Sequence, residues 1–183
     1  MQADPEMYMM KQGMKAPSFA LLATDDKQYK LETFQGKKAL VIVFMCNHCP
    51  YVIAYVERIK KIEQMFRKSS VQFIAINAND PVKYPQDSFE HMKQFVEEKE
   101  ITFPYLYDET QEVAKAYRAL VTPHVFVFDE ERKLVYQGGI DNNWESEEKA
   151  SKHFLTNALN AVVKGQTPIQ AQAPCIGCSI KWK

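Results

Sequence analysis

The sequence predicts an α/β fold in which a central mixed sheet is flanked by helices. Two observations indicate this fold: apolar strands alternate with amphipathic helices through the middle of the chain, and polar turns join further strands into hairpins. At 183 residues the chain is long enough for one well-packed core and short for two. We therefore expect an N-terminal extension at 1–14, one domain at 15–164 and a C-terminal tail at 165–183.

The first half of the chain predicts a β-hairpin followed by a strand–helix–strand unit. Residues 19–22 and 28–31 flank a polar turn, as paired strands do. Residues 39–45 are continuously apolar, which is typical of a strand buried on both faces. From Pro50 to Arg67 the apolar residues recur at helical spacing, and residues 71–77 then form the next buried strand.

The second half predicts shorter elements. In order, they are a helix at about 89–99 capped by Asp87 or Ser88, a strand at 103–107, a short helix at 112–117, a hairpin of strands 125–128 and 134–137, and a helix at roughly 147–164. The last segment contains two prolines and few apolar residues. This composition predicts that it is a mobile tail.

Composition excludes several classes of partner. The chain has 23 basic and 23 acidic residues, so it lacks the charge excess expected of proteins that bind nucleic acid or anionic membranes. It contains no run of roughly 18 apolar residues, and its N-terminus lacks the basic start and apolar stretch of a secretory signal. We expect a cytoplasmic protein, with an exported mature form that has lost its signal as the alternative.

Four cysteines lie in two pairs, Cys46/Cys49 and Cys175/Cys178. This low density argues against a disulfide-stapled scaffold and favours catalytic or metal-binding thiols. The first pair lies between a predicted strand and a predicted helix. A helix N-terminus stabilises a thiolate, and we expect Cys46 to lie there. A protonated His48 between the cysteines would stabilise the anion further, which predicts a redox potential between about −270 and −120 mV.

Several motifs in this order resemble the redoxin branch of the thioredoxin superfamily, the peroxiredoxin-like proteins of the alkyl hydroperoxide reductase/thiol-specific antioxidant (AhpC/TSA) family. The motifs lie at residues 15–19, 46–52, 76–80, 84–88, 121–123 and 177–182, and so span almost the whole chain. The resemblance implies a thioredoxin-like fold with an N-terminal hairpin.

The resemblance also implies roles for individual residues. Cys46 would be the exposed nucleophile, and Cys49 would resolve the mixed disulfide. Pro123 would be a cis-proline opposite the cysteines, and with Thr122 it would form the platform that binds a substrate peptide. Thioredoxins carry a buried acid in the strand before their cysteines, but residues 39–44 contain none. His48 is a candidate for this missing proton acceptor.

Peroxidase activity is the first alternative. Peroxiredoxins have a threonine or serine three residues before the peroxidatic cysteine, and an arginine that polarises the peroxide. If Cys49 is aligned with the peroxidatic cysteine, Cys46 takes the hydroxyl position and the arginine position falls at or near Pro123. Arg118 or His48 would have to substitute.

The second cysteine pair leaves three alternatives open. Cys175 and Cys178 could exchange with the first pair as relay or resolving thiols, remain without a partner, or complete a four-thiolate zinc site with Cys46 and Cys49. A zinc-binding or partner-binding thiol module is thus the second alternative function. The remaining histidines show no metal-ligand spacing and are expected to be solvated: His91, His124 and His153.

These features together predict a thiol:disulfide oxidoreductase that uses Cys46 and Cys49, with His48 as a tuning residue. We expect no metal or organic cofactor. The expected partners are protein disulfides or a thiol reductant such as a thioredoxin, with small peroxides as substrates under the peroxidase alternative.

Overall fold

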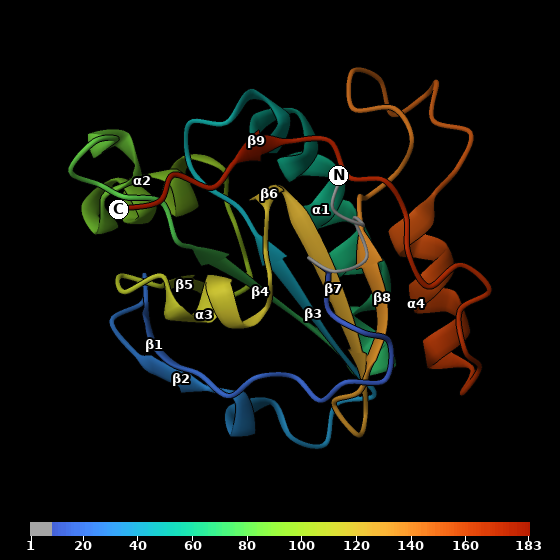
Figure 1. The fold of residues 1–183 in the computed structure, drawn as a ribbon. Coiled ribbons are helices and arrows are strands. Elements are labelled where there is room, and N and C mark those ends of the chain that lie inside the picture. Colours follow the sequence, from blue (N-terminus) through green and yellow to red (C-terminus); the bar gives the residue numbers. More distant parts are fainter. Residues whose placement is uncertain (1–8) are drawn as a thin grey trace, which may run out of the picture.

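A computed structural model describes residues 9–183 (Figure 1). Residues 1–8 of the predicted N-terminal extension lie outside the described residues. None of the helices between residues 9 and 183 combines the length and the apolarity needed to cross a membrane.

The central sheet of the described chain has the strand order β2–β1–β5–β4–β3–β7–β8. It is mixed, because β3, β4 and β5 run parallel while all other neighbours are antiparallel. A second, two-stranded sheet consists of β6 and β9. The strands are β1 (Ala20–Ala23), β2 (Gln28–Lys30), β3 (Ala39–Phe44), β4 (Val71–Asn77), β5 (Tyr105–Tyr107), β6 (Val121–Thr122), β7 (His124–Asp129), β8 (Leu134–Gly138) and β9 (Cys178–Ser179).

Helices cover both faces of the central sheet (Figure 1). Helices α1 (Pro50–Phe66), α2 (Phe89–Glu98) and α4 (Phe154–Val163) share a core with Ala39, Val41 and Val43 of β3. On the other face, α3 (Glu112–Ala116) and the 3-10 helix η2 (Leu31–Phe34) pack with the alternate residues of β3. Two further 3-10 helices are η3 (Arg67–Ser69) and η4 (Pro85–Asp87). Because β3 is buried on both faces, it is apolar at every position.

This arrangement confirms the predicted thioredoxin-like α/β fold. The N-terminal hairpin is present, and the first strand–helix–strand unit lies where periodicity predicts it. The N-cap of α2 is Ser88, whose hydroxyl accepts the backbone N–H of His91. The sheet and α1 together place residues 45–49 at the carboxyl end of β3.

The last helix was predicted to begin too early. It begins at Phe154, not near residue 147. Residues 145–152 contain no large apolar side chain that could hold a helix against the sheet. Instead, Asn142 Oδ1 accepts the backbone N–H groups of Ser151 and Lys152, both at 2.9 Å, and this closes the segment into a loop.

The prediction of a mobile C-terminal tail is wrong. In Figure 1 the tail (red) runs from α4 across the top of the molecule to the C-terminus. Gln137 of β8 exchanges backbone hydrogen bonds with Ala171 and Ala173, and Ile180 is buried. The tail is held mainly through backbone groups and small residues, which leave no hydrophobic periodicity in the sequence.

Candidate active site

The loop between β3 and α1 carries both Cys46 and Cys49. Helix α1 begins at Pro50, and Cys49 is its N-cap residue. Proline is favoured at the first helical position because its missing N–H is not needed there. The helix therefore starts after the second cysteine, so the expectation that Cys46 lies at the helix N-terminus is wrong.

Thr122 contacts both sulfur atoms. Its Oγ1 lies 3.4 Å from Cys46 Sγ, and its carbonyl oxygen lies 3.1 Å from Cys49 Sγ. The Thr122–Pro123 peptide bond is cis, which confirms that prediction. The structure thus brings Cys46, Cys49, Thr122 and Pro123 together, with both thiols free of disulfides.

Neither sulfur-bearing side chain is open to solvent. Cys46 is 1% exposed and Cys49 is 0% exposed, so the expected exposure of Cys46 is not found. Cys178 on β9 packs against the core cluster that contains both residues. The docked tail therefore takes part in enclosing the site.

Asp87 is a site residue that sequence reasoning considered only as a helix cap. Its carboxylate is fully buried. Oδ1 accepts the backbone N–H of Asn47 at 2.8 Å, and Oδ2 accepts the Asn79 side-chain amide at 2.8 Å. The only signal in the sequence was its place in the motif at residues 84–88. Asp87 supplies, from η4, the buried acid that β3 lacks.

His48 lies directly against Asp87. Its Nδ1 lies 2.6 Å from Asp87 Oδ2, and its ring stacks on Tyr84 with centroids 5.4 Å apart. The Cys46 sulfur, one His48 ring nitrogen and one Asp87 oxygen all lie within 4.8 Å of one another. These donor types suit Zn²⁺, so the metal-binding alternative has a geometric basis. No cluster of potential ligands between residues 9 and 183 combines the four thiols.

The pKa values of the two cysteines are shifted in opposite directions. The pKa of Cys46 is raised by its hydrogen bond to Cys49, by burial and by the negative charge of Asp87. The pKa of Cys49 is lowered by the hydrogen bond from the Cys46 thiol, and further by the Cys178 thiol and the backbone N–H groups of Val52 and Cys178, although burial opposes this.

One contact acts against ionisation of Cys49. The Thr122 carbonyl oxygen can accept the Cys49 proton but cannot stabilise a thiolate. The four donors that face the same sulfur outweigh this single acceptor. The contacts therefore lower the pKa of Cys49 and raise that of Cys46.

The other predicted residues are distributed unevenly. Cys178 lies opposite Thr122 in the β6–β9 pair, whereas Cys175 lies in a separate pocket of about 240 Å³ together with Pro123 and Trp144. His124 is buried, not solvated, and its Nδ1 accepts the Leu120 N–H at 3.4 Å. Burial lowers the pKa of His124 to about 4. The exposed Arg118 donates to the Met9 carbonyl at 3.1 Å.

Comparison with known proteins identifies relatives over almost the whole chain. A crystal structure of an uncharacterized conserved protein from Geobacillus kaustophilus is 42% identical, covers 96% of this chain and 94% of its own, and superposes with a TM-score of 0.88. A hypothetical protein from Sinorhizobium meliloti 1021 is 35% identical, covers 95% and 96%, and gives a TM-score of 0.90.

A curated relative carries a functional name. The thiol-disulfide oxidoreductase ResA from Bacillus thuringiensis subsp. konkukian (strain 97-27) is 23% identical over 130 residues, which cover 70% of this chain and 69% of that protein. The Redoxin family model matches residues 11–153, a range that includes the β3–α1 loop and the cis-proline. The chain therefore belongs to the Redoxin family.

Proposed function

We propose that the protein is a thiol:disulfide oxidoreductase in which Cys46 and Cys49 cycle between a dithiol and a disulfide. The observation that carries this proposal is the position of Thr122, which touches both sulfurs and precedes a cis-proline. The similarity to ResA, which is named a thiol-disulfide oxidoreductase, supports the same conclusion.

The contacts favour Cys49 as the attacking sulfur, whereas the family resemblance implied Cys46. A thiolate is the nucleophile in disulfide exchange, and the hydrogen-bond donors converge on Cys49. Cys49 attacks one sulfur of a substrate disulfide, and the other substrate sulfur leaves as a thiolate. Cys46 then loses its proton and attacks Cys49, so that the second substrate thiolate leaves. Two electrons pass from the protein to the substrate.

Asp87 is the candidate acceptor for the Cys46 proton. Its buried carboxylate lies within 4.8 Å of the Cys46 sulfur, and hydrogen bonds from Asn47 and Asn79 hold it in place. The His48 ring lies against this carboxylate, with its Nδ1 2.6 Å from Asp87 Oδ2. The partners proposed for the pair are protein disulfides and a thiol reductant that regenerates the dithiol.

The experiment compares two oxidants on the fully reduced protein: a peptide disulfide and hydrogen peroxide. We expect rapid oxidation by the disulfide, with a Cys46–Cys49 bond among the products in mass mapping. Cys49→Ser removes the reaction, and Cys46→Ser/Cys178→Ser, which removes both thiols near Cys49, leaves a mixed disulfide on Cys49. Cys175→Ser is the matched control and reacts at the rate of the unaltered protein.

Two outcomes would replace this proposal. Fast oxidation by peroxide with slow disulfide exchange would favour the peroxidase alternative. Arg118 or His48 would then have to activate the peroxide, but in this structure Arg118 donates to the Met9 carbonyl and His48 lies against Asp87. Stoichiometric zinc that is released when the cysteines are oxidised would favour a metal-binding thiol module at Cys46, His48 and Asp87.

A further inference from the structure

Strand β9 lies on the backbone edge directly before the cis-proline. The β6–β9 pair is antiparallel, with Val121 opposite Ser179 and Thr122 opposite Cys178. An extended peptide binds such an edge by adding a strand through main-chain hydrogen bonds. The edge that would present a substrate peptide to Cys49 is therefore occupied by residues of the same chain.

Glycines allow the tail to approach this closely. A Cβ atom on Gly177 would lie 2.4 Å from the Thr122 carbonyl oxygen. On β8, a Cβ atom on Gly138 would meet the backbone of Ala173 at 2.3 Å, and one on the next residue, Gly139, would meet Pro174 at 2.7 Å. These three glycines thus allow close backbone contact between the tail and the rest of the chain, which indicates a specific docking position for the tail.

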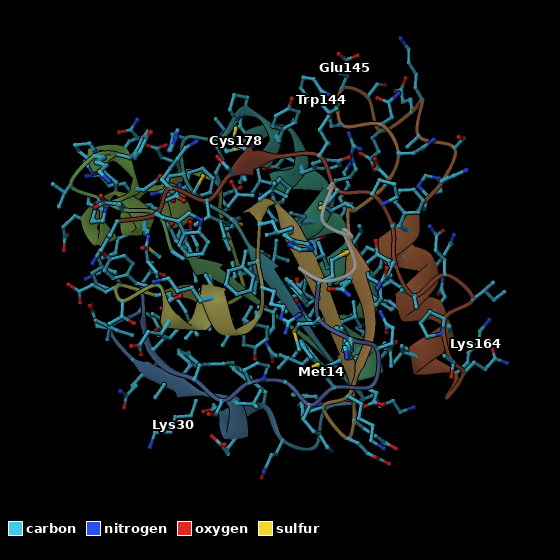
Figure 2. All side chains as sticks on the ribbon, in the orientation of Figure 1. Met14, Lys30, Trp144, Glu145, Lys164 and Cys178 are labelled. Atoms are coloured by element: carbon cyan, nitrogen blue, oxygen red, sulfur yellow. The ribbon has the colours of Figure 1, made fainter. Side chains whose placement is uncertain are left out.

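The residues after Cys178 anchor the strand on its far side. Ile180 is buried, and its N–H donates to the Leu120 carbonyl at 3.1 Å. The Lys181 N–H donates to Asn79 Oδ1 at 2.9 Å, and the Lys181 carbonyl accepts the Asp80 N–H at 2.8 Å. Cys178 is therefore held between two anchored segments. Figure 2 labels Cys178 where the tail crosses the top of the molecule.

Cys178 also lies beside Cys49 of the first cysteine pair. It lies opposite Thr122, whose carbonyl oxygen is 3.1 Å from Cys49 Sγ, and it packs against the core cluster that contains Cys49. Its thiol and its backbone N–H both face the Cys49 sulfur. Cys175 lies instead in the pocket beside Pro123 and Trp144. Only one thiol of the second pair is thus placed to react with Cys49.

We propose that Cys178 is a third redox thiol, which exchanges with the Cys46–Cys49 disulfide to form a Cys49–Cys178 disulfide while β9 occupies the peptide-binding edge. This inference rests on the proposed function, because a substrate disulfide supplies the oxidation. The Cys178 thiolate attacks Cys49 Sγ, the Cys46–Cys49 bond breaks, and Cys46 leaves as a thiolate. The proton given up by Cys178 ends on Cys46, so the exchange consumes no further oxidant.

The exchange has a consequence for access to the site. With a Cys49–Cys178 bond the tail is covalently fixed over Thr122 and Pro123, and a second peptide cannot add to the same edge. Reduction of that bond leaves β9 held by noncovalent contacts alone, from which a substrate can displace it. The form with a Cys49–Cys178 disulfide is therefore closed, and the reduced protein can open.

The test uses the full-length Cys46→Ser variant, in which Cys49 has lost its first partner. The reduced variant is treated with oxidised glutathione, quenched with acid, alkylated and mapped by mass spectrometry. We expect a transient glutathione adduct on Cys49 that is replaced by a Cys49–Cys178 disulfide. The matched control Cys46→Ser/Cys175→Ser gives the same bond, whereas Cys46→Ser/Cys178→Ser retains the adduct.

A second variant tests the docking itself. Cys46→Ser/Gly177→Ala keeps all the reacting thiols but places a methyl group against Thr122. We expect it to form the Cys49–Cys178 bond at least about tenfold more slowly, because the tail loses its high effective concentration at Cys49. Equal rates with and without the added methyl group would show that the close approach of Gly177 to Thr122 does not promote formation of the Cys49–Cys178 bond.

The outcomes separate the two proposals. A persistent adduct on Cys49 in the Cys46→Ser variant, with Cys178 still alkylated, overturns the third-thiol proposal and leaves the proposed function intact. Failure of Cys49 to react with oxidised glutathione in any variant overturns both proposals.

Discussion

At the scale of single residues, the proposed mechanism depends on the Asp87 carboxylate, which the neighbouring sequence does not mark as a site residue. Asp87 lies 38 positions after Cys49 by residue number and belongs to a turn rich in polar residues. Its role arises only when η4 folds against the β3–α1 loop, where Asn47 and His48 meet it. The cysteines could be predicted because their spacing is itself a signal, whereas only the place of Asp87 in the motif at residues 84–88 pointed to it.

Replacing Asp87 with asparagine tests two effects of this carboxylate: its charge raises the pKa of Cys46, and it is the proposed acceptor of the Cys46 proton. Loss of the charge lowers the pKa of Cys46, because Asp87 helps to raise it. Loss of the proton acceptor slows the attack of Cys46 on the mixed disulfide, by about a hundredfold on the scale typical of general-base catalysis. In a Cys178→Ser background, which leaves Cys46 to resolve the adduct, rapid-quench mapping should show the adduct on Cys49 accumulating, while thiolate absorbance shows Cys46 ionising at lower pH.

Asp80→Asn is the matched control for this prediction. Asp80 is also a buried carboxylate near β4, but its Oδ1 accepts the Val82 N–H and it has no sulfur partner in the described chain. It should leave both measurements unchanged. An Asp87→Asn variant that resolves the adduct as fast as the unaltered protein would rule out the acceptor role.

His124 makes the stability of the fold depend on pH. Burial lowers its pKa from the usual 6.5 to about 4, so the unfolded chain binds a proton before the folded protein does. The free energy of unfolding should therefore fall as the pH drops from about 6.5 to about 4, by about 3 kcal/mol. Above pH 6.5 both states are neutral at this residue and its contribution does not change.

Urea denaturation across this pH range checks the prediction. His124→Asn keeps an acceptor for the Leu120 N–H but does not titrate, so its stability should fall less steeply than that of the unaltered protein. The exposed His91 provides the control, and His91→Asn should preserve the original slope. Identical slopes for His124→Asn and the unaltered protein would contradict the assignment.

At the scale of elements, the accuracy of the predictions follows the length of each hydrophobic pattern. Strands β3 and β4 and helix α1 were predicted nearly to the residue, because continuous apolar runs indicate the buried strands and an apolar pattern at period 3.6 indicates the helix. The start of α4 was not, because Asn142 Oδ1 accepts the backbone N–H groups of Ser151 and Lys152 and holds the preceding segment in a loop. The β6–β9 pair was missed, since two residues form no pattern.

A buried ion pair connects α1 to the loop after β8. Arg58 of α1 lies 2.5 Å from Asp141 Oδ2, and the Tyr55 hydroxyl donates to the Asp141 Oδ1 at 3.0 Å. Arg58→Met would leave a buried carboxylate without its counter-charge. We expect the free energy of unfolding to fall by about 3 to 5 kcal/mol in equilibrium denaturation.

Lys61→Met is the control for this pair, because Lys61 lies on the same helix and pairs with Glu147 at the surface. Its replacement should cost less than about 1 kcal/mol. Similar losses for the two variants would show that the Arg58–Asp141 pair holds α1 no more strongly than a surface contact does.

At the scale of the whole molecule, the site forms where distant segments meet at the carboxyl ends of parallel strands β3 and β4. The β3–α1 loop provides the cysteines, η4 provides Asp87, and β6 and β9 provide Thr122 and Cys178. The family motifs indicated most of these segments, but not that the tail lies on the cis-proline platform. That position depends on backbone contact at glycines, which sequence patterns do not reveal.

The central claim is that Cys46 and Cys49 form a reversible redox pair, and the Cys178→Ser variant isolates it. The variant is equilibrated in glutathione buffers of graded potential, quenched with acid, unfolded, alkylated and mapped by mass spectrometry. We predict a single two-electron transition that converts the Cys46–Cys49 disulfide to two alkylated thiols, with a midpoint between about −270 and −120 mV. If both cysteines remain alkylatable at every potential, the pair is not a redox centre.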